Sequence, residues 1–228
     1  AEKLSFEEIL NKEKGEVREA LRQIISREGS KLNYPLKINL RIEETSITNE
    51  LAGDSSGAGL VLINKDPDGQ LFLSRKEMID VCRSFKGPAL FVPSGLEMTA
   101  FENVLLPTGF SEKERKAFKE ISRFTSRFQP FINAVTINGN DKAVPDKWKT
   151  DTLALFTGCE INFNVLQGNH QHETLISYAK KINPDLILFA EQPKTFIETI
   201  FKKDLIEKLL DQTDIPILFY HVQNKKSS

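Results

Sequence analysis

Between residues 102 and 220, hydrophobic positions form five short continuous runs, and the segments between them have helical spacing. Continuous apolar runs are typical of parallel strands, because helices cover both faces of such a sheet and neither face meets water. The alternation of strand and helix therefore predicts a doubly wound α/β domain. The five predicted strands are Val104–Leu106, Ile132–Ile137, Ile161–Leu166, Leu186–Phe189 and Ile215–Tyr220.

The first 97 residues contain a second, shorter series of elements. An apolar stripe at i, i+3, i+4, i+7 and i+8 predicts an amphipathic helix that ends near Gly29. Lys37–Ile42 alternates like a strand, and Gly59–Ile63 is a short apolar strand. Ser74-Arg-Lys-Glu77 has the form of a capping box, which begins a helix. Pro88–Val92 is the last predicted strand of this part.

Three landmarks in residues 98–222 resemble those of a known protein family. Pro107-Thr-Gly-Phe-Ser-Glu112 looks like the turn after the family's first strand, and Val165-Leu-Gln-Gly-Asn169 resembles its third strand and following turn. Asn183-Pro-Asp-Leu-Ile-Leu188, followed by Ile215-Pro-Ile-Leu218, resembles the fourth and fifth strands. Together these landmarks resemble the universal stress protein family. The resemblance implies a parallel five-stranded sheet with strand order 3-2-1-4-5.

The resemblance also implies two tandem units, a partial one in residues 1–97 and a complete one in residues 98–228. The partial unit corresponds to the later part of the fold, and its first strand, first helix and second strand are not found. Without them Lys37–Ile42 lacks a neighbour, and Gly59–Ile63 has an open hydrophobic edge. Either the native N-terminus is missing, which the non-methionine start favours, or another segment supplies the strands. We therefore expect that residues 1–97 do not fold alone.

Composition and charge narrow the class of protein. The chain has 228 residues, 39% of them hydrophobic and 28% charged, as in ordinary soluble domains. A net charge of −1 gives no reason to expect nucleic acid or an anionic membrane as a partner. No apolar run approaches the roughly 20 residues of a membrane span. Two isolated cysteines, Cys82 and Cys159, fit a reducing compartment, so we expect a cytoplasmic protein.

The nucleotide site that the resemblance implies is altered at several positions. Nucleotide-binding members carry a glycine signature after the fourth strand, where backbone N–H groups approach the phosphates. Here no glycine follows Gly168, and Lys203-Asp204 stands at the position of the Gly-Ser pair. In the first unit that pair falls near Arg75-Lys76. The degenerate pocket positions are Thr108, Gly109, Ser111, Gly168, Glu191, Lys203 and Asp204.

These departures predict that the chain does not bind ATP in the family's usual mode and has no cofactor. Gly109 replaces an acidic residue on the adenine side, and the Asp204 and Glu191 carboxylates oppose phosphates. No nucleophile elbow, Walker loop or Cys-x-x-Cys motif is present, so no catalytic residue is assigned.

Two other clusters have simpler explanations than a site. His170-Gln-His172-Glu173 could hold a metal, but it also fits the start of a helix with Asn169 as its N-cap. We expect no metal site. A series of phenylalanines has helical spacing that predicts core packing rather than a base-stacking surface; it comprises Phe118, Phe124, Phe128 and Phe131.

The sequence leaves three functions to compare. The first is a non-enzymatic stress-response or regulatory protein that acts by protein association. Its partner is another protein or a second copy, which binds to an edge of the sheet. Within the chain, we expect Ala89–Val92 to contact Ile215–Tyr220 across a pseudo-twofold axis. The second is an ATP-binding universal stress protein with an altered pocket. The third is the cytoplasmic regulatory tail of a membrane transporter.

Overall fold

The computed structural model describes residues 5–31, 59–65, 74–85, 87–96, 100–110, 114–137, 144–168, 170–191 and 205–221. The contacts divide the chain into two compact units, Ala1–Ser46 and Ile47–Ser228. The first unit contains helix α1 (Phe6–Gly29), which begins in a capping box between Ser5 and Glu8. The predicted helix near Gly29 is thus confirmed, with an earlier start. The predicted strand Lys37–Ile42 lies outside the described residues.

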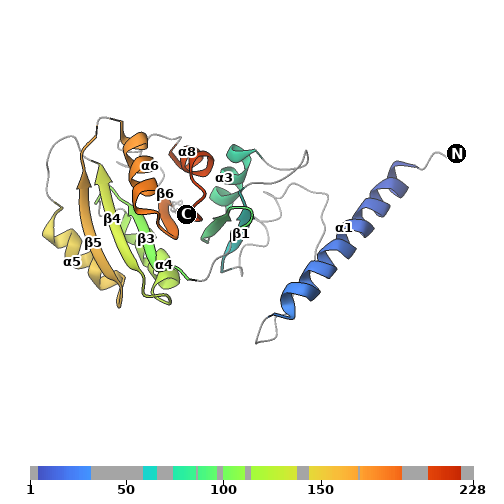
Figure 1. Ribbon diagram of the computed structural model, residues 1–228, viewed down its shortest axis with the longest axis horizontal. Helices are drawn as coiled ribbons and strands as arrows, with labels where there is room; N and C mark the ends of the chain where they lie inside the picture. Colours follow the sequence, from blue (N-terminus) through green and yellow to red (C-terminus); the bar gives the residue numbers. More distant parts are fainter. Residues whose placement is uncertain are drawn as a thin grey trace, which may run out of the picture. The chain divides into compact units, whose positions relative to one another are not determined.

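The second unit is built on one seven-stranded sheet with the order β1-β2-β7-β6-β3-β4-β5 (Figure 1). Every neighbouring pair is parallel except β2 and β7, which are antiparallel. The last five strands along the chain have the order 3-2-1-4-5, so the expected order is confirmed for them. The predicted five-stranded sheet needs correction, because β1 and β2 extend it to seven strands through the antiparallel β2–β7 pair. The strands are β1 (Val61–Asn64), β2 (Ala89–Val92), β3 (Asn103–Pro107), β4 (Phe131–Ile137), β5 (Glu160–Leu166), β6 (Leu186–Glu191) and β7 (Ile217–His221).

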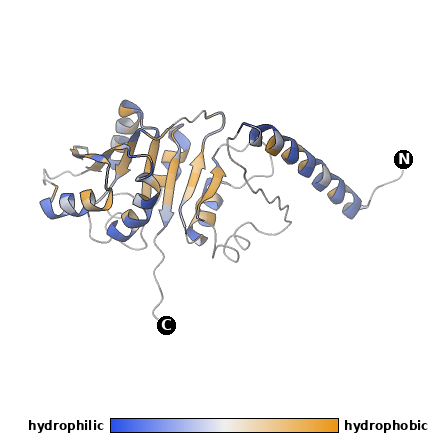
Figure 2. Cartoon of the chain, turned by 90° about the horizontal axis from the view of Figure 1, so that it is seen from below, coloured by the Kyte–Doolittle hydropathy of each residue, from blue (hydrophilic) through white to orange (hydrophobic). Residues whose placement is uncertain are grey.

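Helices cover both faces of this sheet, which confirms the doubly wound prediction. Buried residues of three helices form the core on one face, together with inward side chains of the strands; these helices are α3 (Arg75–Ser84), α6 (Gln171–Ile182) and α8 (Leu205–Gln212). The core of the other face includes buried residues of α4 (Arg115–Thr125) and α5 (Asp146–Leu155). Figure 2 shows that the strands consist mostly of hydrophobic residues, while the helices contain both hydrophobic and hydrophilic residues.

The antiparallel pair β2–β7 joins the two predicted units within one sheet. Leu90 lies opposite Leu218 at the centre of the pair, and Phe91 lies opposite Ile217. The Phe91 and Phe219 rings meet edge to face with centroids 6.3 Å apart. The predicted contact between these two strands is therefore confirmed. Strands from both sides of the predicted boundary between residues 97 and 98 belong to one sheet and contribute to one core. The boundary itself stays a prediction.

A buried lysine ties the first strand to the last helix. Lys65 follows β1 and is 1% exposed, and its Nζ donates to the Leu210 carbonyl at 3.2 Å and to the Thr213 carbonyl. These carbonyls lie at the C-terminal end of α8, where a cation is favourable to the helix dipole. Nearby, the Arg75 side chain binds Asp211 at 2.9 Å. Arg75, which the sequence placed at a phosphate position, therefore contacts a carboxylate instead.

The expectation that the phenylalanine series packs in the core needs correction at one position. Phe118 is buried as predicted, but Phe128 is 46% exposed because the helix ends at Thr125, before it. Its ring still packs edge to face on Phe101, with centroids 5.1 Å apart. Within the described ranges, the protein has no helix long and apolar enough to cross a membrane.

Candidate functional site

The strand order reverses between β3 and β6, and in open α/β sheets ligands bind at the carboxyl ends of the strands at such a point. Thr108 and Gly109 follow β3, and Glu191 ends β6, so three of the predicted positions lie at the carboxyl ends of these neighbouring strands. Gly168 follows β5, two strands further along the sheet. The other predicted positions, Ser111, Lys203 and Asp204, and the side chain of Glu191 lie outside the described residues.

The polar groups of the turn after β3 bind one another. The Thr108 N–H donates to the Val135 carbonyl at 2.8 Å, which extends the β3–β4 pairing. The Thr108 hydroxyl accepts from the Phe110 N–H at 3.0 Å and lies 3.2 Å from Glu114 Oε2. The Gly109 N–H donates to Glu114 Oε1 at 2.9 Å. The backbone donor at the position where the resemblance places an adenine contact is therefore occupied by a side chain of the same chain.

Glu114 is the residue that organises this turn, and the sequence reasoning missed it. Its side chain is 0% exposed, and it stands at the start of α4, where a carboxylate is favourable to the helix dipole. Its two oxygens hold Gly109 and Thr108. A signal was present, since a glutamate three residues after Ser111 fits the pattern of a helix start.

An aromatic cluster fills the space next to the turn. Phe110 has a φ of 53°, a left-handed conformation that is uncommon outside glycine. In this conformation its ring meets Trp148 of α5 edge to face, with centroids 4.4 Å apart. Trp148 also contacts Phe118 at 5.6 Å and Phe163 at 5.9 Å. The surrounding structure thus holds an unfavourable backbone conformation in place and packs apolar rings beside the turn.

Gly168 has a packing role in this structure. A Cβ atom at Gly168 would lie 2.1 Å from Thr174 Oγ1, a distance that no real contact allows. The Thr174 hydroxyl in turn donates to the His170 carbonyl at 2.9 Å. The glycine therefore permits close approach between the turn after β5 and the first turn of α6, which explains it without a bound phosphate.

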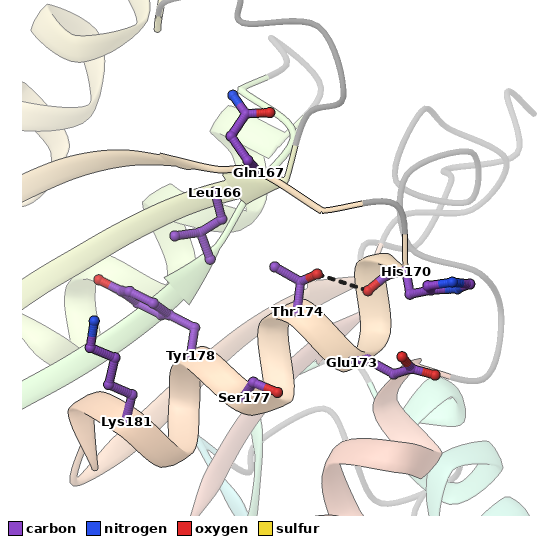
Figure 3. Close-up of a pocket in the computed structure, with 8 residues that line it drawn as sticks. All are labelled: Leu166, Gln167, His170, Glu173, Thr174, Ser177, Tyr178 and Lys181. Carbon is purple, nitrogen blue, oxygen red and sulfur yellow. Dashed lines mark hydrogen bonds between the residues drawn. The ribbon is translucent and has the colours of Figure 1, made fainter.

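An open pocket of about 490 Å³ lies between β5 and α6 (Figure 3). Its lining residues are Leu166, Gln167, His170, Glu173, Thr174, Ser177, Tyr178 and Lys181. Figure 3 shows Tyr178 and Lys181 at one end, while His170 and Glu173 point away at the other. Burial raises the pKa of the Tyr178 phenol, so this hydroxyl is protonated at neutral pH. The charged side chains are exposed and do not converge on one point, so the pocket favours no particular ligand.

The histidines at the start of α6 behave differently from each other. His170, rather than Asn169, stands at the N-cap position, and its side chain makes no capping hydrogen bond. His172 is buried, and its Nδ1 lies 3.2 Å from Lys208 Nζ on α8, so the ring links two helices. Among the residues that the structure describes, no group of three histidine, cysteine, aspartate or glutamate side chains could hold a metal ion.

The two cysteines do not form a disulfide with each other. Cys82 is buried in α3, and Cys159 is half-buried before β5. Burial raises the pKa of the Cys159 thiol, which keeps it protonated at neutral pH. Because the thiolate is the reactive form, this environment gives Cys159 no nucleophilic activation.

Comparison with known proteins supports one fold. No protein-family model and no curated protein sequence matches the chain. A universal stress protein structure from Archaeoglobus fulgidus DSM 4304 matches 97% of this chain and 81% of its own, with a TM-score of 0.71 and 12% identity. A structure from Pseudomonas aeruginosa UCBPP-PA14, proposed to be a universal stress protein, matches 97% and 80%, with a TM-score of 0.57 and 13% identity.

A shorter universal stress protein, solved in complex with cAMP, aligns with 55% of this chain and 100% of its own, at a TM-score of 0.44 and 13% identity. The two universal stress protein structures described first align with 97% of the chain at TM-scores above 0.5, which supports a shared fold. The chain therefore has the universal stress protein fold.

Proposed function

We propose that this protein is a non-enzymatic regulatory protein of universal stress type, with a degenerate nucleotide site, that acts in the cytoplasm by associating with other proteins. The observation that carries the proposal is the occupation of the turn after β3 by the buried side chain of Glu114. A fold alone does not determine function, so the argument rests on this site.

Glu114 opposes a nucleotide in two ways. It takes the Gly109 N–H and contacts the Thr108 hydroxyl, which removes donors that a ligand would use. Each charge-assisted hydrogen bond that is lost in this way weakens binding by roughly 1.5–3 kcal/mol. The Phe110 ring beside it packs on Trp148 and adds apolar bulk at the same place. The acidic residues Glu191 and Asp204, placed here by sequence, add like charge to any phosphate.

The sheet supports association as the mode of action. β2 and β7 already form an antiparallel edge-to-edge contact within the chain, so the edge of β7 lies inside the sheet. A partner protein would therefore use one of the two terminal strands, β1 or β5. Paired main-chain groups and alternate side chains are the usual means by which a sheet edge binds another polypeptide.

Calorimetric titration with Mg-ATP tests the degenerate site. We expect no saturation at micromolar ligand with the wild-type chain, because two or three lost hydrogen bonds weaken binding on the order of a thousandfold. Glu114→Gln removes the charge but keeps an acceptor, and we expect it to remain without saturation. Glu120→Gln, at a partly exposed position of the same helix, is the matched control. A one-site isotherm with the wild-type chain would contradict the proposal and favour a nucleotide-binding function.

A further inference from the structure

The solvent-exposed surface of α4 carries an excess of positive charge. The net charge of the chain is −1, yet residues 115–127 contain five basic residues and one acidic residue, Glu120. All five basic residues are exposed. They are Arg115, Lys116, Lys119, Arg123 and Arg127. The rest of the chain is therefore acidic on balance.

Three of these cations lie on one face of the helix. Lys116, Lys119 and Arg123 occupy positions i, i+3 and i+7, which are neighbours on a helix surface and span roughly 10 Å along its axis. We call these three residues the basic stripe. The buried residues of α4 pack into the core on the sheet, so the stripe faces away from the sheet. Arg127 follows in the turn after the helix.

Other described residues neutralise little of this charge. Arg123 Nη1 lies 2.6 Å from Oε2 of Glu120 in a partly exposed pair, and Arg115, outside the stripe, lies 3.1 Å from Asp151. In the part of the chain that the structure describes, the two lysines of the stripe make no ion pair. Ion pairs at the surface are weak, so Arg123 can exchange Glu120 for the carboxylate of a partner at little cost.

The basic stripe does not stabilise the helix that carries it. Like charges three or four residues apart repel each other on a helix surface, and a cation in the first turn, such as Lys116, is unfavourable to the helix dipole. α4 has no acidic residue in its first turn, whereas every other described helix has at least one. Those residues are Glu7, Glu8, Glu77, Asp146, Glu173 and Glu207. The stability of the fold therefore does not account for the charges of α4, whereas a partner of opposite charge does.

An exposed aromatic ring lies just after the stripe. Phe128 is 46% exposed, and its ring packs on half-buried Phe124 with centroids 5.6 Å apart. Because α4 ends at Thr125, this ring lies near the C-terminal end of the stripe. Aromatic and arginine side chains are enriched in protein–protein interfaces, where aromatic rings supply much of the binding energy. The surface thus combines a row of cations with an apolar contact point.

We propose that the basic stripe and Phe128 bind an acidic amphipathic helix of a partner protein. The partner helix presents carboxylates at the same i, i+3 and i+7 spacing, followed by one apolar side chain that contacts the Phe128 ring. Opposite charges attract the two helices and set their register, while the aromatic contact buries apolar surface. The inference goes beyond the sheet-edge association proposed above, because this surface includes neither terminal strand of the sheet.

Other partners fit this surface less well. Nucleic acids and anionic membranes bind through many contacts over a long surface, whereas the stripe is a short row of cations on a chain that is otherwise acidic on balance. A second copy of this chain offers no matching element among the described helices, because each of them carries lysine or arginine in addition to its carboxylates. An acidic segment of a different protein therefore fits best.

A titration of the intact, isotope-labelled chain with synthetic peptides, followed by the chemical shifts of its backbone amides, tests the proposal. The probe is an alanine-based helical peptide with glutamates at i, i+3 and i+7 and a leucine one turn later. A control peptide has the same composition, with its glutamates spread around the helix. We expect the probe to shift amides of residues 115–128 and to saturate below roughly 1 mM at about 50 mM salt, where surface charges are little screened. The control peptide should bind at least about fivefold more weakly.

Two substitutions locate the surface. Lys119→Glu should weaken binding of the probe by about fivefold or more, because it replaces an attraction by a repulsion. Lys180→Glu is the matched control, since Lys180 is exposed on α6, which belongs to the core on the other face of the sheet. Phe128→Ala should weaken binding by roughly threefold, because it removes the apolar contact.

Three outcomes would overturn the inference. One is the absence of shifts in residues 115–128 up to roughly 1 mM probe. Another is equal weakening by the two glutamate substitutions, which indicates a general effect of net charge. A third is no binding of the probe together with saturable binding of a single-stranded DNA oligonucleotide that Lys119→Glu weakens, which assigns the stripe to nucleic acid. None of these changes the Mg-ATP result, so failure here and failure of the proposed function are distinguishable.

Discussion

The segments β1-α3-β2 and β6-α8-β7 have the same order of elements and the same pairing pattern, but their surroundings differ. Leu188 in β6 is completely buried between the sheet and α4, whereas Leu62, its equivalent in β1, is largely exposed. Both strands read as continuous apolar runs, which predict burial on two faces. The comparison shows that an apolar strand is buried only where neighbouring elements cover it.

The largest expected difference between the two segments concerns these leucines. Leu188→Ala should lower the free energy of unfolding by about 2–5 kcal/mol, because it leaves a cavity in a packed core. Leu62→Ala should change it by less than about 0.5 kcal/mol, since the side chain is mostly in water. Urea denaturation of both variants measures the difference. Equal losses would mean that Leu62 is covered in solution.

Lys65 is the second test, because it holds the β1 segment to the end of α8. Lys65→Met keeps the apolar stem but removes the donor to the Leu210 and Thr213 carbonyls. We expect a loss of about 1–3 kcal/mol in the free energy of unfolding, the usual effect of leaving a buried polar group unsatisfied. Lys76→Met, at an exposed position on α3, serves as control in the same urea titration. If the two variants lose the same amount, Lys65 does not hold the helix end.

The capping box of α3 should have a smaller effect. The Ser74 hydroxyl accepts from the Glu77 N–H at 3.3 Å, and its removal in Ser74→Ala should cost about 1 kcal/mol of stability. Ser74→Thr keeps the hydroxyl and should retain most of the stability. The melting temperatures of the two variants distinguish loss of the capping hydrogen bond from a change in side-chain size. A loss for threonine as large as that for alanine would argue against the capping role.

The ion pair between α3 and α8 should contribute least among the contacts that join the two segments. Arg75 and Asp211 are partly exposed and 2.9 Å apart, so we expect a coupling energy of about 0.2–1 kcal/mol that decreases with salt. A double-mutant cycle with Arg75→Ala and Asp211→Ala measures it. The pair Arg83 and Asp80 within α3, which is exposed to a similar degree, provides a comparison cycle. A coupling energy that high salt leaves unchanged would show that the pair is screened from solvent.

Acid should weaken the start of α3 through Glu77. Hydrogen bonds from the Ser74 hydroxyl and backbone N–H hold the pKa of the Glu77 carboxyl below its usual value of 4.5. Because the pKa of Glu77 is lower in the folded state than in the unfolded state, its carboxylate stabilises the fold at pH values above the unfolded-state pKa. That stabilisation is lost as the pH falls through the folded-state pKa. The difference in stability between wild type and Glu77→Gln should therefore shrink in that acidic range. A difference that stays constant with pH would contradict the role of the charged carboxylate.

The strands show how far sequence reasoning extends. All five strands predicted after residue 102 are present, with ends that differ by one or two residues, because apolar runs of this length between helical segments have few other solutions. The predicted β2–β7 contact is also confirmed, since exposed apolar edges favour pairing. Phe128 was assigned to the core by its spacing, but the helix ends before it, and helix ends are poorly determined by periodicity.

The candidate site was predicted less completely. The sequence indicated what the turn after β3 lacks, namely the acidic residue that Gly109 replaces. It did not indicate that Glu114 enters the turn and takes the Gly109 N–H, because that contact depends on how α4 begins relative to β3. It also gave Gly168 a place in the pocket, while its close approach to Thr174 depends on how α6 packs.

By itself the sequence determined the order of strands and helices, the alternation that makes the sheet parallel, and the loss of the glycine signature, because these are local properties of composition and spacing. Tertiary structure alone decided that Leu188 is buried and Leu62 exposed, that Lys65 binds the end of α8, and that Glu114 closes the turn. The physical reason is that burial and hydrogen-bond partners belong to pairs of elements distant in the chain, and identical local patterns acquire different partners when the sheet is assembled.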